Sequence, residues 1–389
     1  MRALSFKNPR HAEKILLEMG VDPQGAKLMA PKTVHICIRL DDVPVHAAQI
    51  LKQEMLSLGG DAAVARGTVI HSIKETPVIL MGTYKQYRKL ISKLKMQPFK
   101  LAELAHNIAA LLEKYNKDLA PIKCGSFTLP IHERTVIMGI LNITPDSFSD
   151  GGKYFDAASA LEHAHQMVAE GADIIDVGAE STRPGHLPVD CQEELKRLTR
   201  VLDKLLQEIK VPVSVDTYKA STAEEVLKMG VHIINDVWGL KKDAAMAGVI
   251  AKYKVPVVIM HNQEGAEYND LMADIIQWLR DSIAIAQEAG IEPQKIIIDP
   301  GIGFGKTLEH NLEVMDRLDE FKILGKPLLI GTSRKSIIGK TLNLPVEDRV
   351  EGTAATVALG IARGASIVRV HDVKEMVRVC KMMDAMVRR

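Results

Sequence analysis

Eight short apolar runs, each followed by a longer amphipathic segment, recur from Val136 to the C-terminus and constrain the fold more than any other feature. Segments of helical periodicity separate them, for example AASALEHAHQMVAEGA and EELKRLTRVLDKLLQEI. Such alternation is typical of repeated βα units and a parallel sheet. Eight units in about 250 residues match a closed barrel. We therefore predict an α/β protein with a (β/α)8 TIM barrel over 126–389, built on VIMGIL (136–141), DIIDVG (173–178), PVSVD (212–216), HIIND (232–236), PVVIMH (256–261), KIIID (295–299), PLLIG (327–331) and SIVRVH (366–371).

A doubly wound open sheet is the alternative architecture. It would usually carry a glycine-rich phosphate turn after its first strand, whereas the first run here leads into Asn142-Ile143-Thr144-Pro145. The glycine-rich stretch GIGFGKT (301–307) does not supply a nucleotide loop either, because the Walker pattern requires glycine five residues before Gly305 and Pro300 stands there. We therefore favour the barrel.

Residues 1–125 form a smaller α/β module in our interpretation. Residues 33–40 alternate like a strand, Asp42 is expected to cap a helix running to about residue 58, and 77–83 reads as another strand. Helices are expected over 84–95 and 99–116. The stretch 115–130, with its Pro and Gly, reads as a linker. The module shows no metal spacing, phosphate loop or basic aromatic patch, so its function stays unknown at this stage.

The charge balance and the cysteine spacing indicate which classes of partner this protein does not bind. The chain has 50 Lys+Arg and 49 Asp+Glu and no block of like charges, which argues against a nucleic-acid partner. Its four cysteines form no CxxC pair, so neither a zinc knuckle nor a disulfide framework is indicated. No run resembles a signal peptide or a membrane span. We expect a cytoplasmic protein with no membrane partner.

Polar residues end every predicted strand of the barrel. The carboxyl ends of the strands are where a TIM barrel carries its chemistry. One polar residue after a strand is usually a helix cap or turn former. Eight such ends form a convergent polar cup, which is typical of a ligand site. These ends carry Asn142, Glu180 to Arg183, Asp216, Asn235 with Asp236, His261, Asp299, Ser333 to Lys335, and Arg369 with His371.

The last strand favours a phosphorylated ligand. Arg369 and His371 alternate, so both side chains point to the same face, and a guanidinium beside an imidazole suits phosphate oxygens. The alternative is an ion pair with Asp372 or Glu375.

Seven motifs in this order give the chain a specific resemblance to the dihydropteroate synthase family. The resemblance spans every predicted barrel unit. It implies that 4-aminobenzoate displaces pyrophosphate from 6-hydroxymethyl-7,8-dihydropterin pyrophosphate, giving 7,8-dihydropteroate in folate biosynthesis, with Mg²⁺ required. The motifs are LNITPDSFSDGG (141–152), GAESTRPG (178–185), VDT (215–217), IND (234–236), DPGIGFGK (299–306), SRKS (333–336) and RVHDV (369–373).

The resemblance also implies how the pterin and the metal are held. Asn142 would supply a carbonyl oxygen to Mg²⁺, which prefers oxygen ligands. Asp216, Asn235 and Asp299 would bind the donor-rich amino-pyrimidinone edge of the pterin. Lys335 would reach the pterin carbonyl and ring face. The alternatives are helix caps for the two aspartates, a loop tie for Asn235 with Asp236 exposed, and a solvated lysine.

Further roles follow from the same resemblance. Arg369, His371 and Asn142 would hold the pyrophosphate leaving group, whose stabilisation is the largest catalytic demand. Asp150 would lie near the metal or the cationic pterin, and we hypothesise that pyrophosphate leaves before the amine attacks. The 4-aminobenzoate pocket would comprise Thr182, Arg183, Pro184, Phe304 and Ser333; for Phe304 the alternative is a buried aromatic under a loop.

Two other functions stay open. A pterin-dependent methyltransferase of a related barrel would keep Asp216, Asn235 and Asp299 but would have no evident use for the STRPG loop, SRK or the Arg369/His371 pair. A non-catalytic pterin-binding protein would bind without turnover. The family further implies small-molecule substrates, sulfonamide inhibition and a homodimer formed through the last barrel helices.

Overall fold

The computed structural model describes residues 1–143, 157–180 and 189–388. The chain divides into two compact units, Met1–Lys117 and Asp118–Arg389. Residues 118–125, which the sequence analysis assigned to the N-terminal module, belong to the second unit. No helix in the described ranges combines the length and the apolar character that crossing a bilayer requires.

The first unit is an antiparallel three-stranded sheet with helices. Its strands are β1 (His35–Pro44), β2 (Asp61–Val64) and β3 (Glu75–Thr83) in the order β1-β3-β2. Asp42 has φ +52° and lies at a register shift between Leu40 and Val43, so it caps no helix. The sequence analysis missed β2 and the first two of the helices, which are α1 (Pro9–Glu18), α2 (Pro23–Met29), α3 (Val45–Ser57), α4 (Tyr84–Leu94) and α5 (Leu101–Asn116).

The second unit is a (β/α)8 barrel, as the sequence predicts. Its parallel strands follow the order β11-β10-β9-β8-β7-β6-β13-β12, and a parallel bridge between Ile298 and Leu328 joins the two ends of this row. Each apolar run forms a strand, with bounds shifted by no more than two residues: β6 (Val136–Asn142), β7 (Ile174–Gly178), β8 (Val213–Asp216), β9 (Ile233–Asp236), β10 (Val257–Met260), β11 (Ile296–Asp299), β12 (Leu329–Ile330) and β13 (Ile367–Val370).

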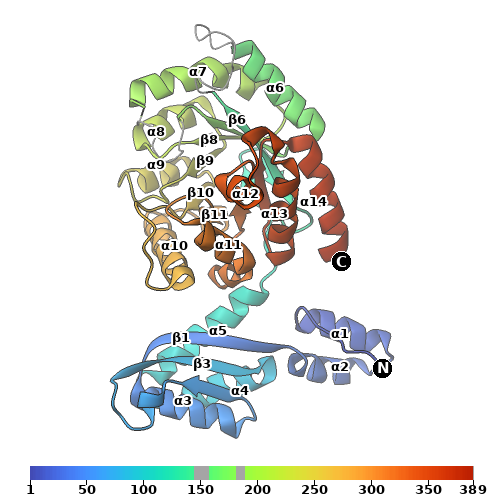
Figure 1. The fold of residues 1–389 in the computed structure, drawn as a ribbon, viewed down its shortest axis with the longest axis vertical. Helices are drawn as coiled ribbons and strands as arrows, with labels where there is room; N and C mark the ends of the chain where they lie inside the picture. The colour runs from blue at the N-terminus through green and yellow to red at the C-terminus, as the bar shows by residue number, and fades with distance from the viewer. Residues whose placement is uncertain (144–156, 181–188, 389) are drawn as a thin grey trace. The chain divides into compact units, whose positions relative to one another are not determined.

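Helices surround this sheet (Figure 1). Alternate strand residues, such as Ile175 and Val177 on β7, belong to the core shared with the helices. Gly139 permits close packing, because a Cβ there would lie 2.8 Å from Met167 Sδ and 3.3 Å from Val373. The helices are α6 (Ala157–Glu170), α7 (Cys191–Glu208), α8 (Ala220–Met229), α9 (Met246–Tyr253), α10 (Leu271–Glu288), α11 (Leu308–Asp316), α12 (Ser336–Leu342), α13 (Val350–Arg363) and α14 (Val373–Val387).

A β-hairpin joins the apolar inner layer of the barrel. It consists of β4 (Ile122–Cys124) and β5 (Phe127–Leu129), joined by a turn in which Gly125 has φ +61°. The linker reading of 115–130 was therefore wrong. The hairpin forms because its alternate residues are buried with inward-facing strand residues, the cluster being Ile122, Cys124, Leu129, Ile131, Val136, Met138, Ile174, Ile233, Val258, Ile297, Leu329 and Ile367.

Candidate active site

The inward-facing positions of four barrel strands, β7, β9, β11 and β13, change from apolar to polar toward the strand end. On β7, Ile174 lies in the apolar inner cluster, and Asp176, two residues further on, points the same way. The strand ends therefore deliver polar side chains above an apolar floor. The same step of two residues leads from Ile233 to Asn235, from Ile297 to Asp299 and from Ile367 to Arg369.

Arg369 joins the carboxylates of two other strands. Its Nε donates to Asp176 Oδ2 at 2.6 Å, and one terminal nitrogen donates to Asp216 Oδ2 at 3.0 Å. Asn235 Nδ2 donates to the same Asp176 oxygen at 3.1 Å. Four strands thus meet in one network. The ion pair with Asp372 or Glu375 considered for Arg369 was wrong, since Asp372 pairs with Arg334 instead.

Burial shapes the acidity of this network. It raises the pKa of Asp216 to about 7, although the Arg369 guanidinium lowers it and Asp176 raises it further. Burial also raises the pKa of Asp299, against the opposing charge of Lys335. Three buried oxygens, Asp176 Oδ1, Asp216 Oδ1 and Ser214 Oγ, find no hydrogen-bond partner within the described part of the chain. Unpartnered buried acceptors are costly, so these oxygens suit a ligand rich in N–H donors.

Lys335 lies across the loop that follows β11. Its Nζ donates to the Ile302 carbonyl at 2.5 Å and sits 4.5 Å from the centre of the Phe304 ring. A side chain at Gly303, where φ is +87°, would press on Lys335 Cδ at 3.1 Å, so only glycine leaves room there. Burial lowers the pKa of Lys335 to about 8, with Asp299 opposing. The solvated-lysine alternative was wrong.

Asn142 stands at the end of β6, on the side of Gly178 opposite Asp216. A Cβ built on Gly178 would lie 3.6 Å from Asn142 Oδ1 and 3.8 Å from Asp216 Cβ, so the two side chains flank this glycine. The absence of a side chain at Gly178 leaves the space between β6 and β8 open above the strand ends.

Ser333 and His371 form a separate pair at the ends of β12 and β13. Ser333 Oγ accepts from the His371 backbone N–H at 3.1 Å and lies 3.1 Å from its Nδ1. Gly331 connects this side of the cup to the rest, because a Cβ there would be 3.8 Å from both Arg369 Cβ and Lys335 Nζ. Ser333 and His371 are each two residues further along the chain than Gly331 and Arg369. The Ser333–His371 pair therefore lies next to Arg369.

The side chains of two strand-end residues, Asp236 and His261, contact the loops that follow the strands and not the Arg369 network. Asp236 is buried and accepts from Trp238 N at 2.8 Å and Leu240 N at 2.7 Å. The alternative that Asn235 ties the loop with Asp236 exposed was thus the reverse of the arrangement found. His261 Nδ1 lies 2.9 Å from Lys306 Nζ, and burial lowers the pKa of His261 to about 2.

The helix-cap alternative fails for Asp216, since α8 has Lys219 at its N-cap position and no side-chain cap. Asp299 has a local role as well, accepting from Gly301 N at 2.7 Å. Four predicted site residues, Asp150, Thr182, Arg183 and Pro184, lie outside the described residues.

Asp176 is a buried carboxylate of this network that the strand-end pattern did not predict. It stands inside DIIDVG, two residues before the end of this strand at Gly178. The sequence held a signal for it, because Asp176 is two residues from Ile174 and therefore faces the same side of the strand. In a strand that is buried on both faces, a carboxylate needs a charged partner.

Comparison with known proteins agrees with this arrangement of residues. A family model described as pterin binding enzyme matches residues 138–371. Over 269 residues the chain is 54% identical to the dihydropteroate synthase of Clostridium beijerinckii, which covers 69% of this chain and 100% of that protein. The chain belongs to the pterin-binding enzyme family, with the dihydropteroate synthases. A structure of this family from Clostridium difficile, solved with pteroic acid, is 55% identical and superposes with a TM-score of 0.65, covering 66% of this chain and 98% of that one.

One relative in the family also matches the N-terminal unit. A probable bifunctional folylpolyglutamate synthase/dihydropteroate synthase from Halobacterium salinarum is 40% identical over 382 residues, which is 96% of this chain and 46% of that protein. The N-terminal unit is therefore present, joined to a pterin-binding barrel, in another protein of the family.

Proposed function

We propose that this member of the pterin-binding family is a dihydropteroate synthase. The exocyclic C–O bond of 6-hydroxymethyl-7,8-dihydropterin pyrophosphate breaks, the nitrogen of 4-aminobenzoate bonds to that carbon, and the nitrogen releases one proton. The products are 7,8-dihydropteroate and pyrophosphate. The single observation that carries the proposal is the buried acceptor cluster of Asp176, Asp216 and Asn235 around Arg369, in a chain 54% identical to a named synthase.

The acceptor cluster fits the pterin. The amino-pyrimidinone edge presents several N–H donors, and Asp176 Oδ1 and Asp216 Oδ1 are buried acceptors that suit them. Asp299 would be a further acceptor, and Lys335, whose charge acts on Asp299, would supply a cation for the pterin carbonyl. Donors that meet these acceptors would remove their desolvation penalty, which makes recognition specific for this edge.

The leaving group lies, in this proposal, toward Arg369 and His371. Two of the five N–H donors of Arg369 go to carboxylates, which fixes the plane of the guanidinium before substrate arrives. The histidine is oriented by Ser333. A preorganised cation stabilises charge as it develops on pyrophosphate, and this is usually the largest catalytic contribution.

Mg²⁺ is part of the proposal, and the residues present fit it. No group of three His, Cys, Asp or Glu residues in the described ranges has the geometry of a metal cage. A single amide oxygen, that of Asn142, suits Mg²⁺, because this ion is commonly held by few protein ligands together with water and substrate phosphates. When bound, Mg²⁺ would neutralise pyrophosphate charge, and Asp150 would lie near it.

The amine substrate needs little activation. An aromatic amine is nucleophilic when neutral, so the protein has to position it and exclude water. Phe304, half-buried beside Lys335, and Ser333 would line its pocket together with Thr182, Arg183 and Pro184. Departure of pyrophosphate ahead of the attack is favoured because the pterin ring delocalises positive charge from the exocyclic carbon.

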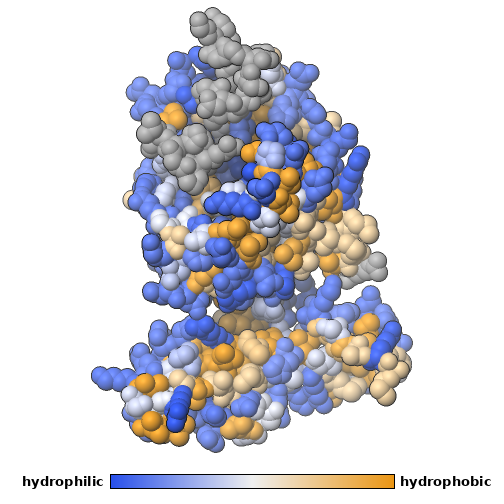
Figure 2. Space-filling model, in the orientation of Figure 1, coloured by the Kyte–Doolittle hydropathy of each residue, from blue (hydrophilic) through white to orange (hydrophobic). Residues whose placement is uncertain are grey.

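Assembly and location complete the proposal. The last barrel helices carry exposed apolar side chains, and hydrophobic residues gather over α12 and α13 in Figure 2. A homodimer formed there would bury Leu342, Leu359, Met382 and Met386. The four cysteines form no disulfide, which suits a reducing cytoplasm.

Pyrophosphate release tests the function directly. The purified chain, mixed with the pterin pyrophosphate, 4-aminobenzoate and Mg²⁺, should release pyrophosphate and form dihydropteroate in equal amounts, and a sulfonamide should inhibit both. Omission of 4-aminobenzoate is the control for hydrolysis. Binding of pterin without product in the complete mixture would contradict the proposal and point to a binding protein; transfer of a methyl group from a methylated pterin would point to a methyltransferase.

A further inference from the structure

A lysine near the end of the loop after β11 binds back to the backbone of that loop. Lys306 Nζ donates to the carbonyl oxygens of Gly301 and Phe304, each at 3.1 Å, and lies 2.9 Å from Nδ1 of His261. His261 follows β10 and is 1% exposed. We call the side chains of Lys306 and His261 the loop clamp, because together they join the loop to the neighbouring strand.

The loop that the clamp holds carries two groups that the proposed function assigns to the substrates. Phe304 would line the 4-aminobenzoate pocket, and the carbonyl oxygen of Ile302 accepts from Lys335 Nζ at 2.5 Å. The centre of the Phe304 ring lies 4.5 Å from the same nitrogen. A shift of this loop would therefore move Lys335 as well as Phe304.

We propose that the loop clamp positions Lys335 and Phe304 for the two substrates, because it fixes the backbone on both sides of Ile302. This inference rests on the proposed function, in which Lys335 binds the pterin and Phe304 contacts the amine. Neither residue of the clamp contacts the reacting atoms, since both act through the loop.

Histidine suits this position because it can bond to the lysine in either protonation state. Burial lowers the pKa of Lys306 to about 7, with the charge of Asp299 raising it and that of Lys335 lowering it. Burial also lowers the pKa of His261 to about 2, and the charges of Lys306 and Lys241 lower it further, so the imidazole is neutral. A neutral imidazole accepts at Nδ1 from an ammonium group, or donates from Nδ1 to a neutral amine in its other tautomer. The bonds of the clamp therefore persist on both sides of pH 7.

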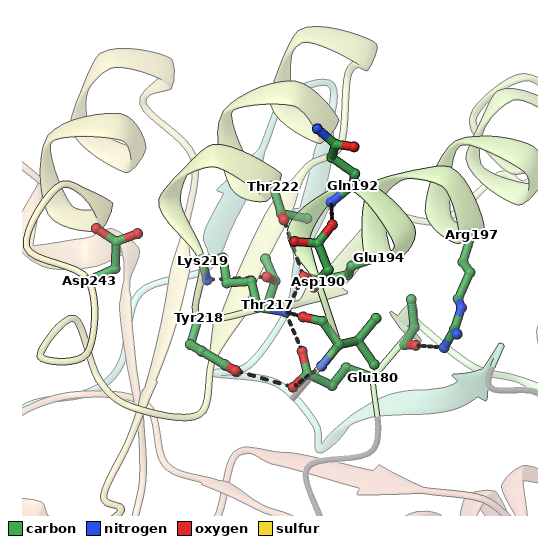
Figure 3. Close-up of polar contacts among 12 residues, drawn as sticks. Glu180, Asp190, Gln192, Glu194, Arg197, Thr217, Tyr218, Lys219, Thr222 and Asp243 are labelled. Carbon is green, nitrogen blue, oxygen red and sulfur yellow. Dashed lines mark hydrogen bonds and ion pairs between the residues drawn. The ribbon is translucent and has the colours of Figure 1, made fainter. Parts of the chain in front are cut away.

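The partners of Lys306 differ from those of a lysine held by ion pairs, such as Lys219. Lys219 Nζ donates to Glu180 Oε2 at 2.5 Å and to Glu194 Oε2 at 2.8 Å (Figure 3). Burial lowers the pKa of Lys219, but the hydrogen bonds to the two glutamates more than compensate and leave it raised. Lys306 is bonded instead to an imidazole and two carbonyl groups, which stabilise a buried ammonium group less than carboxylates do. Stability alone therefore gives little reason for a lysine at this position.

Hydrogen exchange in the full chain without ligand tests whether the clamp holds the loop. His261→Phe keeps an aromatic ring to pack on Trp278, whose ring centre is 5.0 Å from that of His261, but removes the Nδ1 partner of Lys306. His261→Asn is smaller, and its amide offers both an acceptor and a donor. We expect exchange in a peptide spanning 299–307 to be about fivefold faster in His261→Phe, and within about twofold of the wild type in His261→Asn.

Substrate binding tests whether the clamp positions the two side chains. We expect His261→Phe to raise the Kd for pterin and the KM for 4-aminobenzoate about fivefold each, while His261→Asn keeps both within about twofold of the wild type. Lys306→Met, which removes the donor and keeps the length, should match His261→Phe. A loss of stability alone would lower the melting temperature but leave both constants unchanged, because Kd and KM describe the folded molecules.

Thr222→Val is the matched control. It removes a buried hydrogen bond to Glu194 Oε2, 3.2 Å long, and changes neither the loop nor the clamp (Figure 3). The melting temperature should fall, while exchange in the loop, the Kd for pterin and the KM for 4-aminobenzoate should stay at their wild-type values.

Three outcomes would overturn the inference. Unchanged exchange in His261→Phe would show that the clamp does not hold the loop, and faster exchange with unchanged Kd and KM would show that it positions nothing. Equal losses in His261→Asn and His261→Phe would follow side-chain volume and not the bond to Lys306. If Lys306→Met fails to fold, the two His261 variants decide, since both keep the lysine. A wild-type protein that forms no dihydropteroate would refute the proposed function instead, and the exchange measurement would still decide whether the clamp exists.

Discussion

At the scale of single residues, the site depends on carboxylates that are buried close to one guanidinium. Asp176 and Asp216 share Arg369, and Asp299 faces Lys335. Such pairs are weak sources of stability, because desolvation offsets much of their attraction. Their presence at the strand ends is what the proposed pterin site would require, because acceptors must be in place before the ligand arrives.

The pH dependence of pterin binding follows from these groups. In the proposed site, pterin binding would need Asp216 ionised, to accept from the pterin, and Lys335 protonated, to donate to it. Burial raises the pKa of Asp216 to about 7 and lowers that of Lys335 to about 8. Affinity should thus be highest between pH 7 and pH 8, fall on acidification as Asp216 takes up a proton, and fall at higher pH as Lys335 loses one.

Asp216→Asn should remove the acidic limb of that profile. An amide does not titrate, so affinity should become nearly constant below pH 7 while dropping about tenfold or more at the optimum, because an acceptor charge is lost. Titration of pterin fluorescence from pH 5.5 to 9 measures both effects. Asp316→Asn, an exposed control, should keep both limbs; an unchanged acidic limb in Asp216→Asn would assign it to another group.

At the scale of elements, the hairpin β4–β5 shows what sequence patterns of short strands leave undetected. Each of its strands has three residues, too few to display a period, and its Gly and Pro neighbours resemble those of a linker. Only the tertiary contacts of Ile122 and Leu129 with the inner barrel layer explain why it folds. The eight barrel strands were predictable because their buried runs alternate with long helices.

Ile122→Ala should destabilise the barrel. The side chain is fully buried in the inner cluster, so its truncation leaves a cavity and should lower the free energy of unfolding by about 2–4 kcal/mol. Both tryptophans, Trp238 and Trp278, lie in the barrel unit, so tryptophan fluorescence in urea follows this transition alone. Lys123→Ala, on the exposed face of the same strand, should change it by less than about 0.5 kcal/mol. Equal effects would contradict the hairpin's burial.

At the scale of the whole molecule, predictability differed between the two units. The barrel and most of the cup followed from the alternating runs and their polar ends, since eight repeats reinforce one interpretation. Asp176 did not, because its partner Arg369 is 193 residues away and no local pattern joins them. For the N-terminal unit, the sequence predicted the three longest helices and two of the strands. It predicted no function, because the polar residues of this unit form no recognisable motif.

Removal of residues 1–117 should leave an active barrel. The C. beijerinckii synthase is matched along 100% of its length by 69% of this chain, so a protein of barrel size carries the synthase name. The N-terminal unit has its own core, in which Tyr87 is fully buried and its hydroxyl bonds to the Leu80 carbonyl at 2.8 Å. We therefore expect fragment 118–389 to keep kcat and both KM values within about twofold of the full chain, and to sediment as a dimer.

A second truncation controls for the choice of boundary. A fragment that starts at residue 130 also loses β4 and β5, so the inner apolar layer is exposed at that end and the fragment should aggregate or unfold. Activity in the longer fragment alone would locate the functional boundary between residues 117 and 130. If fragment 118–389 folds by tryptophan fluorescence but has lost activity, the N-terminal unit must act on the barrel's substrates, and the independence of the two units would be refuted.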